Sequence, residues 1–122
     1  MDTSVWIEYL RQNVDYFQDV QSMLARRMIV SVEPIFAELT YGVKNRKDKQ
    51  MLNSYWQVLP RIDFGTDSML EAAEYANNND FQQLGIGLID ALIIQAAIQG
   101  DHLIWTLDKR INSNIDSKHI YK

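Results

Sequence analysis

Residues 88–98 have the sequence LIDALIIQAAI, and this stretch decides the fold that the sequence predicts. Nine of its eleven residues are apolar and lie all around the helical circumference, which is typical of a buried helix. Gly87 precedes the stretch, and Gly100 provides a stop. Asp90, in the first turn, carries the only charge. An unpaired buried carboxylate is costly, so Asp90 needs a cation, the positive end of the helix dipole or a metal ion.

The composition limits the class of protein. A chain of 122 residues with 47% hydrophobic and 23% charged residues fits one soluble domain with a hydrophobic core. No apolar run approaches the ~20 residues of a membrane span, and no signal peptide is recognisable. Cysteine is absent, which excludes disulfides and sulfur-ligated zinc. We therefore predict a single domain over residues 1–122, located in the cytoplasm and without a membrane partner.

Short apolar stretches alternate with helical patterns along the chain. MIVSV (residues 28–32) and HLIWT (residues 102–106) predict buried strands, and residues 60–65 and 119–121 predict weaker ones. Pro34 fits the first turn of the helix that follows the first strand. Strands separated by helices predict an α/β domain with three layers, a mostly parallel central sheet flanked by helices.

Four acidic residues are expected at one edge of this sheet. Ligands of parallel sheets gather at the carboxyl ends of the strands. Glu38 follows the first predicted strand by six residues, and Asp108 comes directly after HLIWT. Asp2 would occupy the same edge if a strand preceded it, and Asp90 opens the buried helix. This placement predicts that the four acids meet.

Clustered carboxylates repel one another unless a cation lies among them. Oxygen ligands select Mg²⁺ or Mn²⁺ rather than zinc, and such an ion activates water for attack on a phosphodiester. Thr106 can add a hydroxyl that orients water, although such hydroxyls more often cap a helix or strand end. His102 and His119 are the only histidines, and the sequence has no HExxH, GxSxG, P-loop or GxGxxG motif.

Four motifs in order carry a resemblance to a known family. They are MDTSVWIEYL at residues 1–10, PIFAELTYG at 34–42, GIGLIDALIIQAA at 85–97 and HLIWTLDKRI at 102–111. Together they resemble a PIN-domain ribonuclease, and in particular the VapC-like toxins of toxin–antitoxin modules. The resemblance covers nearly the whole chain.

The resemblance implies a set of site residues. Asp2, Glu38, Asp90 and Asp108 match the four acids of the family that bind the metal, and Thr106 matches the hydroxyl residue two positions before the last acid. The implied activity is Mg²⁺- or Mn²⁺-dependent cleavage of tRNA or other structured RNA. The family also implies a homodimer and a cognate antitoxin that neutralises the enzyme.

One feature departs from the family and leaves alternatives open. Family members begin with a hydrophobic strand before the first aspartate, whereas only Met1 precedes Asp2, so either the start lies too late or the strand is truly missing. A catalytically impaired PIN-like module that binds RNA or an antitoxin is therefore an alternative. A phosphatase with an aspartate nucleophile is another, but such enzymes carry a second aspartate where this chain has Ser4. Lys109 and Arg110, beside Asp108, are the best candidates for phosphate contact.

Overall fold

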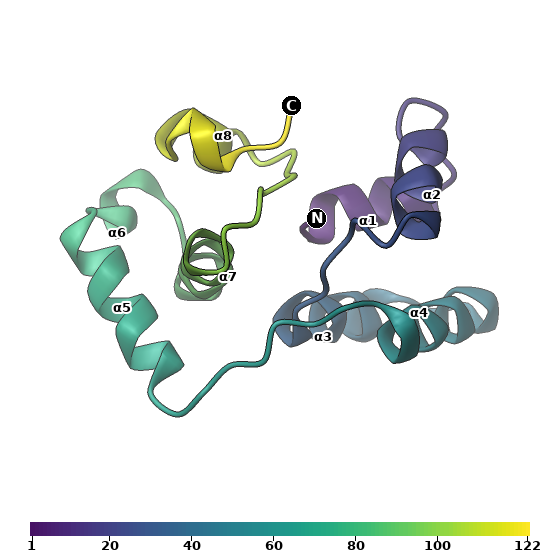
Figure 1. Ribbon diagram of the computed structural model, residues 1–122, viewed down its shortest axis with the longest axis horizontal. Coiled ribbons are helices and arrows are strands. Elements are labelled where there is room, and N and C mark those ends of the chain that lie inside the picture. The colour runs from purple at the N-terminus through teal and green to yellow at the C-terminus, as the bar shows by residue number, and fades with distance from the viewer. The chain divides into compact units, whose positions relative to one another are not determined.

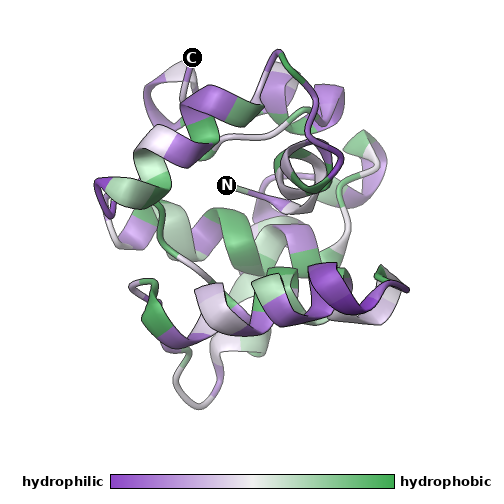
Figure 2. Cartoon of the chain, turned by 90° about the vertical axis from the view of Figure 1, so that its right-hand side faces the viewer, coloured by the Kyte–Doolittle hydropathy of each residue, from purple (hydrophilic) through white to green (hydrophobic).

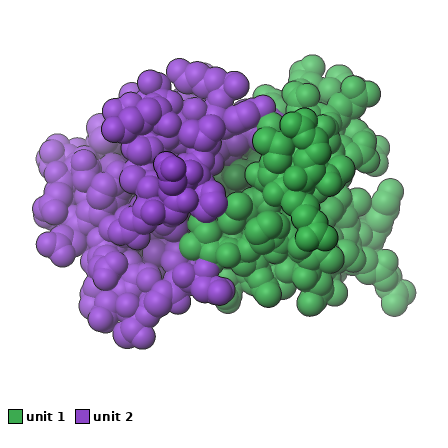
Figure 3. Space-filling view, in the orientation of Figure 1, with its two compact units in different colours: residues 1–62 green, residues 63–122 purple.

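The computed structural model describes all of residues 1–122 and consists almost entirely of helices (Figure 1). In chain order they are α1 (Thr3–Leu10), α2 (Phe17–Ala25), α3 (Glu33–Gly42), α4 (Arg46–Val58), α5 (Ser68–Asn78), α6 (Phe81–Leu84), α7 (Leu88–Gln99), α8 (Lys109–Asn114) and the 3₁₀ helix η1 (Ser117–His119). The helices divide into two units, residues 1–62 and 63–122, which Figure 3 shows in green and purple. The single domain predicted over residues 1–122 stays a prediction.

The predicted three-layer α/β fold is wrong, because the chain forms no sheet. Helices account for 62% of the chain and strand positions for 3%. Residues 28–32 and 102–106 are extended, as their β-branched composition predicts, but neither forms a strand. The mostly parallel central sheet is therefore replaced by helices packed on helices.

The backbone pairing explains why no sheet forms. Ser31 makes an isolated parallel bridge with Arg61, and Ile104 makes one with Ile120. In the first pair the Ser31 N–H donates to the carbonyl oxygen of Pro60 at 2.7 Å, and the Ser31 carbonyl oxygen accepts from the Ile62 N–H at 3.0 Å. Each extended segment thus pairs over one residue with a segment of its own unit, and no ladder develops from either pair.

In unit 1, aromatic side chains from three helices make a common core. Trp6 of α1 lies with its ring centroid 5.2 Å from that of Phe36 of α3 and 5.5 Å from that of Tyr55 of α4. The hydroxyls of Tyr9 and Tyr55 are 2.8 Å apart. Burial and this hydrogen bond raise the pKa of Tyr9. These contacts hold α1 against α3 and α4, and the rings of Phe36 and Trp56, 5.3 Å apart, join α3 to α4.

In unit 2, α7 packs against α5 and provides the centre of the core. Ala91, Ile94 and Ala97 are buried in a cluster with side chains from α6, α8 and the extended segments; the cluster also contains Phe81, Ile86, Ile104, Ile111, Ile115 and Ile120. The predicted helix is confirmed, with Gly87 as its N-cap and Gly100 as its C-cap. Its predicted burial on all sides is wrong at the start, where Leu88 and Ile89 are 45% and 43% exposed.

Most helices have one hydrophobic and one hydrophilic side, and Figure 2 shows both kinds of residue alternating along them. None of the helices combines the length and the apolar character needed to cross a membrane.

The two sides of α7 should respond differently to truncation. Ile94 is 1% exposed, so Ile94→Ala leaves a cavity in the core of unit 2 and should lower the free energy of unfolding by about 2–5 kcal/mol. Ile89→Ala is the matched control on the same helix, and because Ile89 is largely exposed it should cost about 1 kcal/mol or less. Urea denaturation followed by circular dichroism measures both values; equal losses would contradict the packing of α7 described above.

Candidate functional site

Asp2 lies at the start of α1 and caps it. Its Oδ1 accepts a hydrogen bond from the backbone N–H of Ser4 at 3.0 Å and another from the Ser4 hydroxyl. An aspartate in this position satisfies a donor that the first turn of a helix leaves without a partner. The cap therefore holds the Asp2 carboxylate in a defined orientation.

Glu38 lies on α3, which packs against α1. Its side chain is exposed, and its Oε2 accepts a hydrogen bond of 3.4 Å from the hydroxyl of Thr3. Thr3 is the residue that follows Asp2. The two predicted site acids of unit 1, Asp2 and Glu38, thus lie at the same end of α1.

Asp108 caps α8, and its carboxylate is also paired with a cation. Oδ1 accepts from the backbone N–H of Arg110 at 2.9 Å. The Arg110 guanidinium adds two bonds, from Nε to Oδ1 at 3.2 Å and from Nη2 to Oδ2 at 3.0 Å. The guanidinium therefore holds the pKa of the Asp108 carboxyl below its usual range.

Thr106 positions the backbone that leads into this cap. It is 4% exposed, and its Oγ1 accepts a hydrogen bond from the backbone N–H of Asp108 at 3.0 Å. Its carbonyl oxygen accepts another from the side-chain amide of Asn112 at 2.9 Å. The residue two positions before the last acid thus fixes the turn that presents Asp108.

Arg110 also links Asp108 to the start of α7. Its Nη1 donates to the carbonyl oxygen of Gly85 at 2.8 Å. The hydrogen bonds and charge of Asp108, followed by the charge of Asp90, raise the pKa of Arg110. Asp90, in the first turn of α7, thus lies within electrostatic reach of the same guanidinium. Arg110 is thus ion-paired with Asp108, and the charge of Asp90 acts on it more weakly.

The sequence analysis missed this pairing, because it considered Arg110 only as a phosphate contact. The signal was present in the sequence: an arginine two residues after an N-cap aspartate lies in the first turn of the same helix, within reach of that carboxylate. Lys109, the other candidate, is exposed and makes no ion pair with Asp108.

Each unit thus carries two of the predicted acids: Asp2 and Glu38 lie in unit 1, and Asp90 and Asp108 lie in unit 2. No group of three or more histidine, cysteine, aspartate or glutamate side chains that could hold a metal ion is found. The donor set of both pairs consists of carboxylate oxygens with hydroxyls beside them, from Thr3 and Thr106. Such oxygen donors fit a hard divalent cation such as Mg²⁺ or Mn²⁺.

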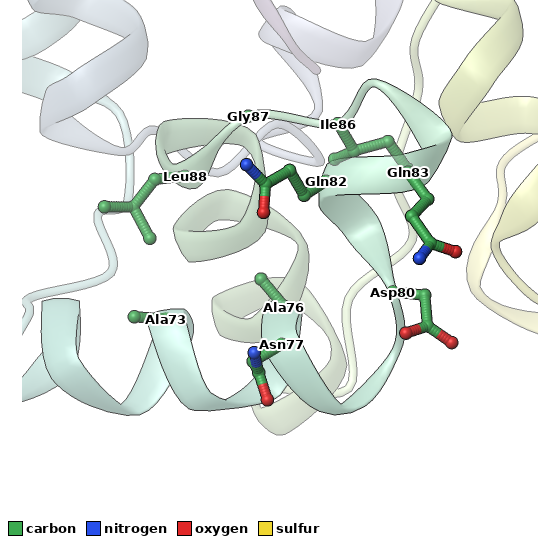
Figure 4. A pocket seen from close by; sticks show the side chains of 9 residues that line it. All are labelled: Ala73, Ala76, Asn77, Asp80, Gln82, Gln83, Ile86, Gly87 and Leu88. Atoms are coloured by element: carbon green, nitrogen blue, oxygen red, sulfur yellow. The ribbon is translucent and has the colours of Figure 1, made fainter.

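A pocket of about 490 Å³ lies in unit 2 beside the start of α7. Figure 4 shows side chains from three segments around it: α5, α6 with the turn before it, and residues 86–88. Asn77, Gln82 and Gln83 supply amides, while Ala76 and Leu88 supply apolar surface. The pocket shares Leu88 with the first turn of α7 that carries Asp90, and its lining has no basic residue.

Comparison with known proteins gives one positive finding. A family model described as the PIN domain matches residues 1–115. The matched range includes all four acids and Thr106. No curated protein matches the chain.

The pairing of Arg110 with Asp108 can be tested without any activity assay. Arg110→Gln removes the guanidinium, so the pKa of Asp108 should rise toward the ordinary value of about 3.9. The lowered pKa of Asp108 stabilises the fold above that ordinary value, and this stabilisation is lost as the pH falls through the lowered folded pKa. The variant should therefore show a smaller dependence of stability on pH in this acid range.

Titration of the Asp108 carboxyl carbon by NMR measures the change in pKa. Lys109→Gln is the matched control, because it removes a neighbouring positive charge that makes no hydrogen bond to Asp108. An Asp108 pKa that moves as much in the control as in Arg110→Gln would show that the specific pairing has no effect.

Proposed function

The chain belongs to the PIN domain family, and from this membership we propose that it is a metal-dependent endoribonuclease that hydrolyses phosphodiester bonds of RNA. PIN domains are generally metal-dependent nucleases, so the chain is a nuclease-type domain. The observation that carries the proposal is the match over residues 1–115, a range that contains the four acids predicted from the sequence motifs. Structured RNA such as tRNA is the proposed substrate.

We propose that Asp2, Glu38, Asp90 and Asp108, the acids that match the family's motifs, are the residues that bind Mg²⁺ or Mn²⁺. PIN domains typically use divalent metal ions. When bound, such an ion lowers the pKa of a water molecule and stabilises the negative charge that develops on the phosphate. The carboxylates supply the oxygen ligands that these ions prefer.

The remaining roles follow from the hydrogen bonds of the chain. The Ser4 N–H and hydroxyl hold the Asp2 carboxylate at the helix start. The Thr106 hydroxyl accepts from the Asp108 backbone and so fixes the turn that carries this acid. Arg110 balances the charge of Asp108 in the free protein. A water that attacks the phosphate gives its proton to solvent or to an acid of the site, with Glu38 the most exposed candidate.

The biological role is also a proposal. The motifs resemble those of VapC-like toxins, so we propose that the chain is the toxin of a toxin–antitoxin module, acts as a homodimer and is neutralised by a cognate antitoxin. The acidic site would receive a basic or bulky side chain of that antitoxin.

A second candidate function is a PIN-like module that binds RNA or an antitoxin without cleaving RNA. The observation that favours it is the double contact of Arg110 with Asp108, which engages both carboxylate oxygens. With the bond from the Arg110 backbone N–H, three of the roughly four lone-pair sites of the carboxylate are occupied, so a metal ion has only the remaining site on Oδ2 unless Arg110 moves. Metal binding without cleavage would distinguish this module from the nuclease.

The first experiment is cleavage of a total small-RNA pool with Mg²⁺ and with EDTA. We expect cleavage that requires the metal and falls by about 100-fold or more in Asp90→Asn, because the variant removes a charged ligand of the site. Calorimetric titration with Mn²⁺ on the same samples measures metal binding independently of cleavage.

Glu74→Gln is the matched control, since it removes one carboxylate from the exposed face of α5 and should leave cleavage unchanged. Cleavage that persists in EDTA and in Asp90→Asn would contradict the four-acid site. Mn²⁺ binding by a chain that does not cut RNA would support the second candidate function.

A further inference from the structure

A groove of about 320 Å³ in unit 1 begins at the candidate site. Glu38 and Thr3, which are joined by a hydrogen bond, both line it. The groove continues along α1 to Arg11 and reaches the segment between α3 and α4, where Lys44 lines it. Its volume falls within the range of about 300–1,000 Å³ that is typical of small-molecule sites. One of the residues that line the groove, Glu38, is thus also a proposed metal ligand.

The groove combines apolar and basic surface. Ile7, Leu10 and Val43 line it with apolar side chains, of which Ile7 is 36% exposed. Its two cations have little else to bind. Lys44 makes no ion pair, and Arg11 has one exposed contact of 3.7 Å with Glu8. Exposed ion pairs of this kind contribute little.

The acidic residue at the far side of the groove makes no ion pair with these cations. Asp48 is engaged with the N-cap of α4, where its carboxylate accepts from the Asn45 amide at 2.8 Å and its N–H donates to the same side chain at 2.8 Å. Lys44 has no ion pair and Arg11 only a weak one, so both can contact an anionic ligand at the end of the groove away from Glu38.

We propose that this groove binds the nucleotide next to the phosphodiester that is cut. The phosphate of that nucleotide contacts Lys44 and Arg11, and its base lies against Ile7 and Val43. This inference rests on the proposed function, because it is the role of Glu38 in cleavage that identifies the ligand. A single-stranded nucleotide offers both features that the groove accepts, an anionic phosphate and a flat apolar face.

Gly42, the last residue of α3, allows the groove to be filled without disturbing the fold. It lines the groove, and a Cβ placed on it would have no neighbouring atom within 4 Å. Gly42→Leu should therefore fold at least as stably as the natural chain, because most residues favour a helix more than glycine does. Thr40→Leu is the matched control, since it adds an apolar side chain to an exposed position of α3 that does not line the groove.

Binding is measured by the fluorescence anisotropy of a short labelled single-stranded RNA, with Mg²⁺ present and the Asp90→Asn background used to prevent cleavage. Gly42→Leu should raise the Kd about tenfold, and Thr40→Leu should leave it unchanged. Thermal unfolding of each variant confirms that the fold is kept. An unchanged Kd in a folded Gly42→Leu variant overturns the proposal.

Charge variants test the phosphate contact separately. Lys44→Ala should raise the Kd about fivefold and reduce the slope of log K against log salt by about 0.7, as expected for one lost phosphate contact on a single strand. Lys118→Ala removes the same charge from an exposed residue that does not line the groove, and it should leave both values unchanged. Equal effects of the two lysine variants would indicate general attraction and overturn the proposal.

The outcome of this experiment is separable from that of the proposed function. If the natural chain cuts no RNA, the binding measurement still decides whether the groove contacts a nucleotide. If Gly42→Leu binds and cuts RNA normally but escapes inhibition by an antitoxin, the groove binds protein instead, and the proposal is wrong.

Discussion

The packing of α7 on α5 is the interaction on which unit 2 depends. Ala91, Ile94 and Ala97 lie in the core, so the middle of α7 has no room for a charge. A carboxylate in this part of the helix would lose its hydration without gaining a partner. The only charge of α7 is therefore confined to its first turn, where Asp90 lies near the guanidinium of Arg110. The requirement of the core thus determines where on this helix an acidic residue can stand.

Three of the four candidate acids lie at the start of a helix. Asp2 and Asp108 are N-caps, and Asp90 is in the first turn of α7. Backbone N–H groups that point out of a helix start interact favourably with a negative charge, so local structure orients these acids. Glu38 differs, because it lies on the exposed side of α3 and its position depends on the packing of α3 against α1. Local structure thus orients three of the candidate acids, and tertiary packing positions the fourth.

The helices could be predicted from the sequence, whereas the absence of a sheet could not. Asp2 as a cap, Pro34 in a first turn and the glycines around α7 act through neighbouring residues, so their effect is visible in the sequence. The β-branched run at 28–32 predicted a buried strand, but in the structure only Ser31 forms a bridge. Whether such a segment joins a sheet depends on which segments lie beside it in space. The site divides in the same way: the motif spacing identified the acids, but the contact of Arg110 with Asp108 and the groove beside Glu38 needed the folded chain.

Gly85 lies where the Arg110 side chain reaches from α8, which Asp108 caps, to the turn before α7, which carries Asp90. Its backbone has φ +75°, a conformation that other residues rarely adopt, and a Cβ on it would lie 3.4 Å from the Cδ of Arg110. The arginine lies against this turn before α7, where it donates to the Gly85 carbonyl oxygen while it pairs with Asp108 at α8. The consequence concerns how the protein matures. Asp108 is paired with an arginine of its own unit, so the cap of α8 can form in a newly synthesised chain without any bound cation.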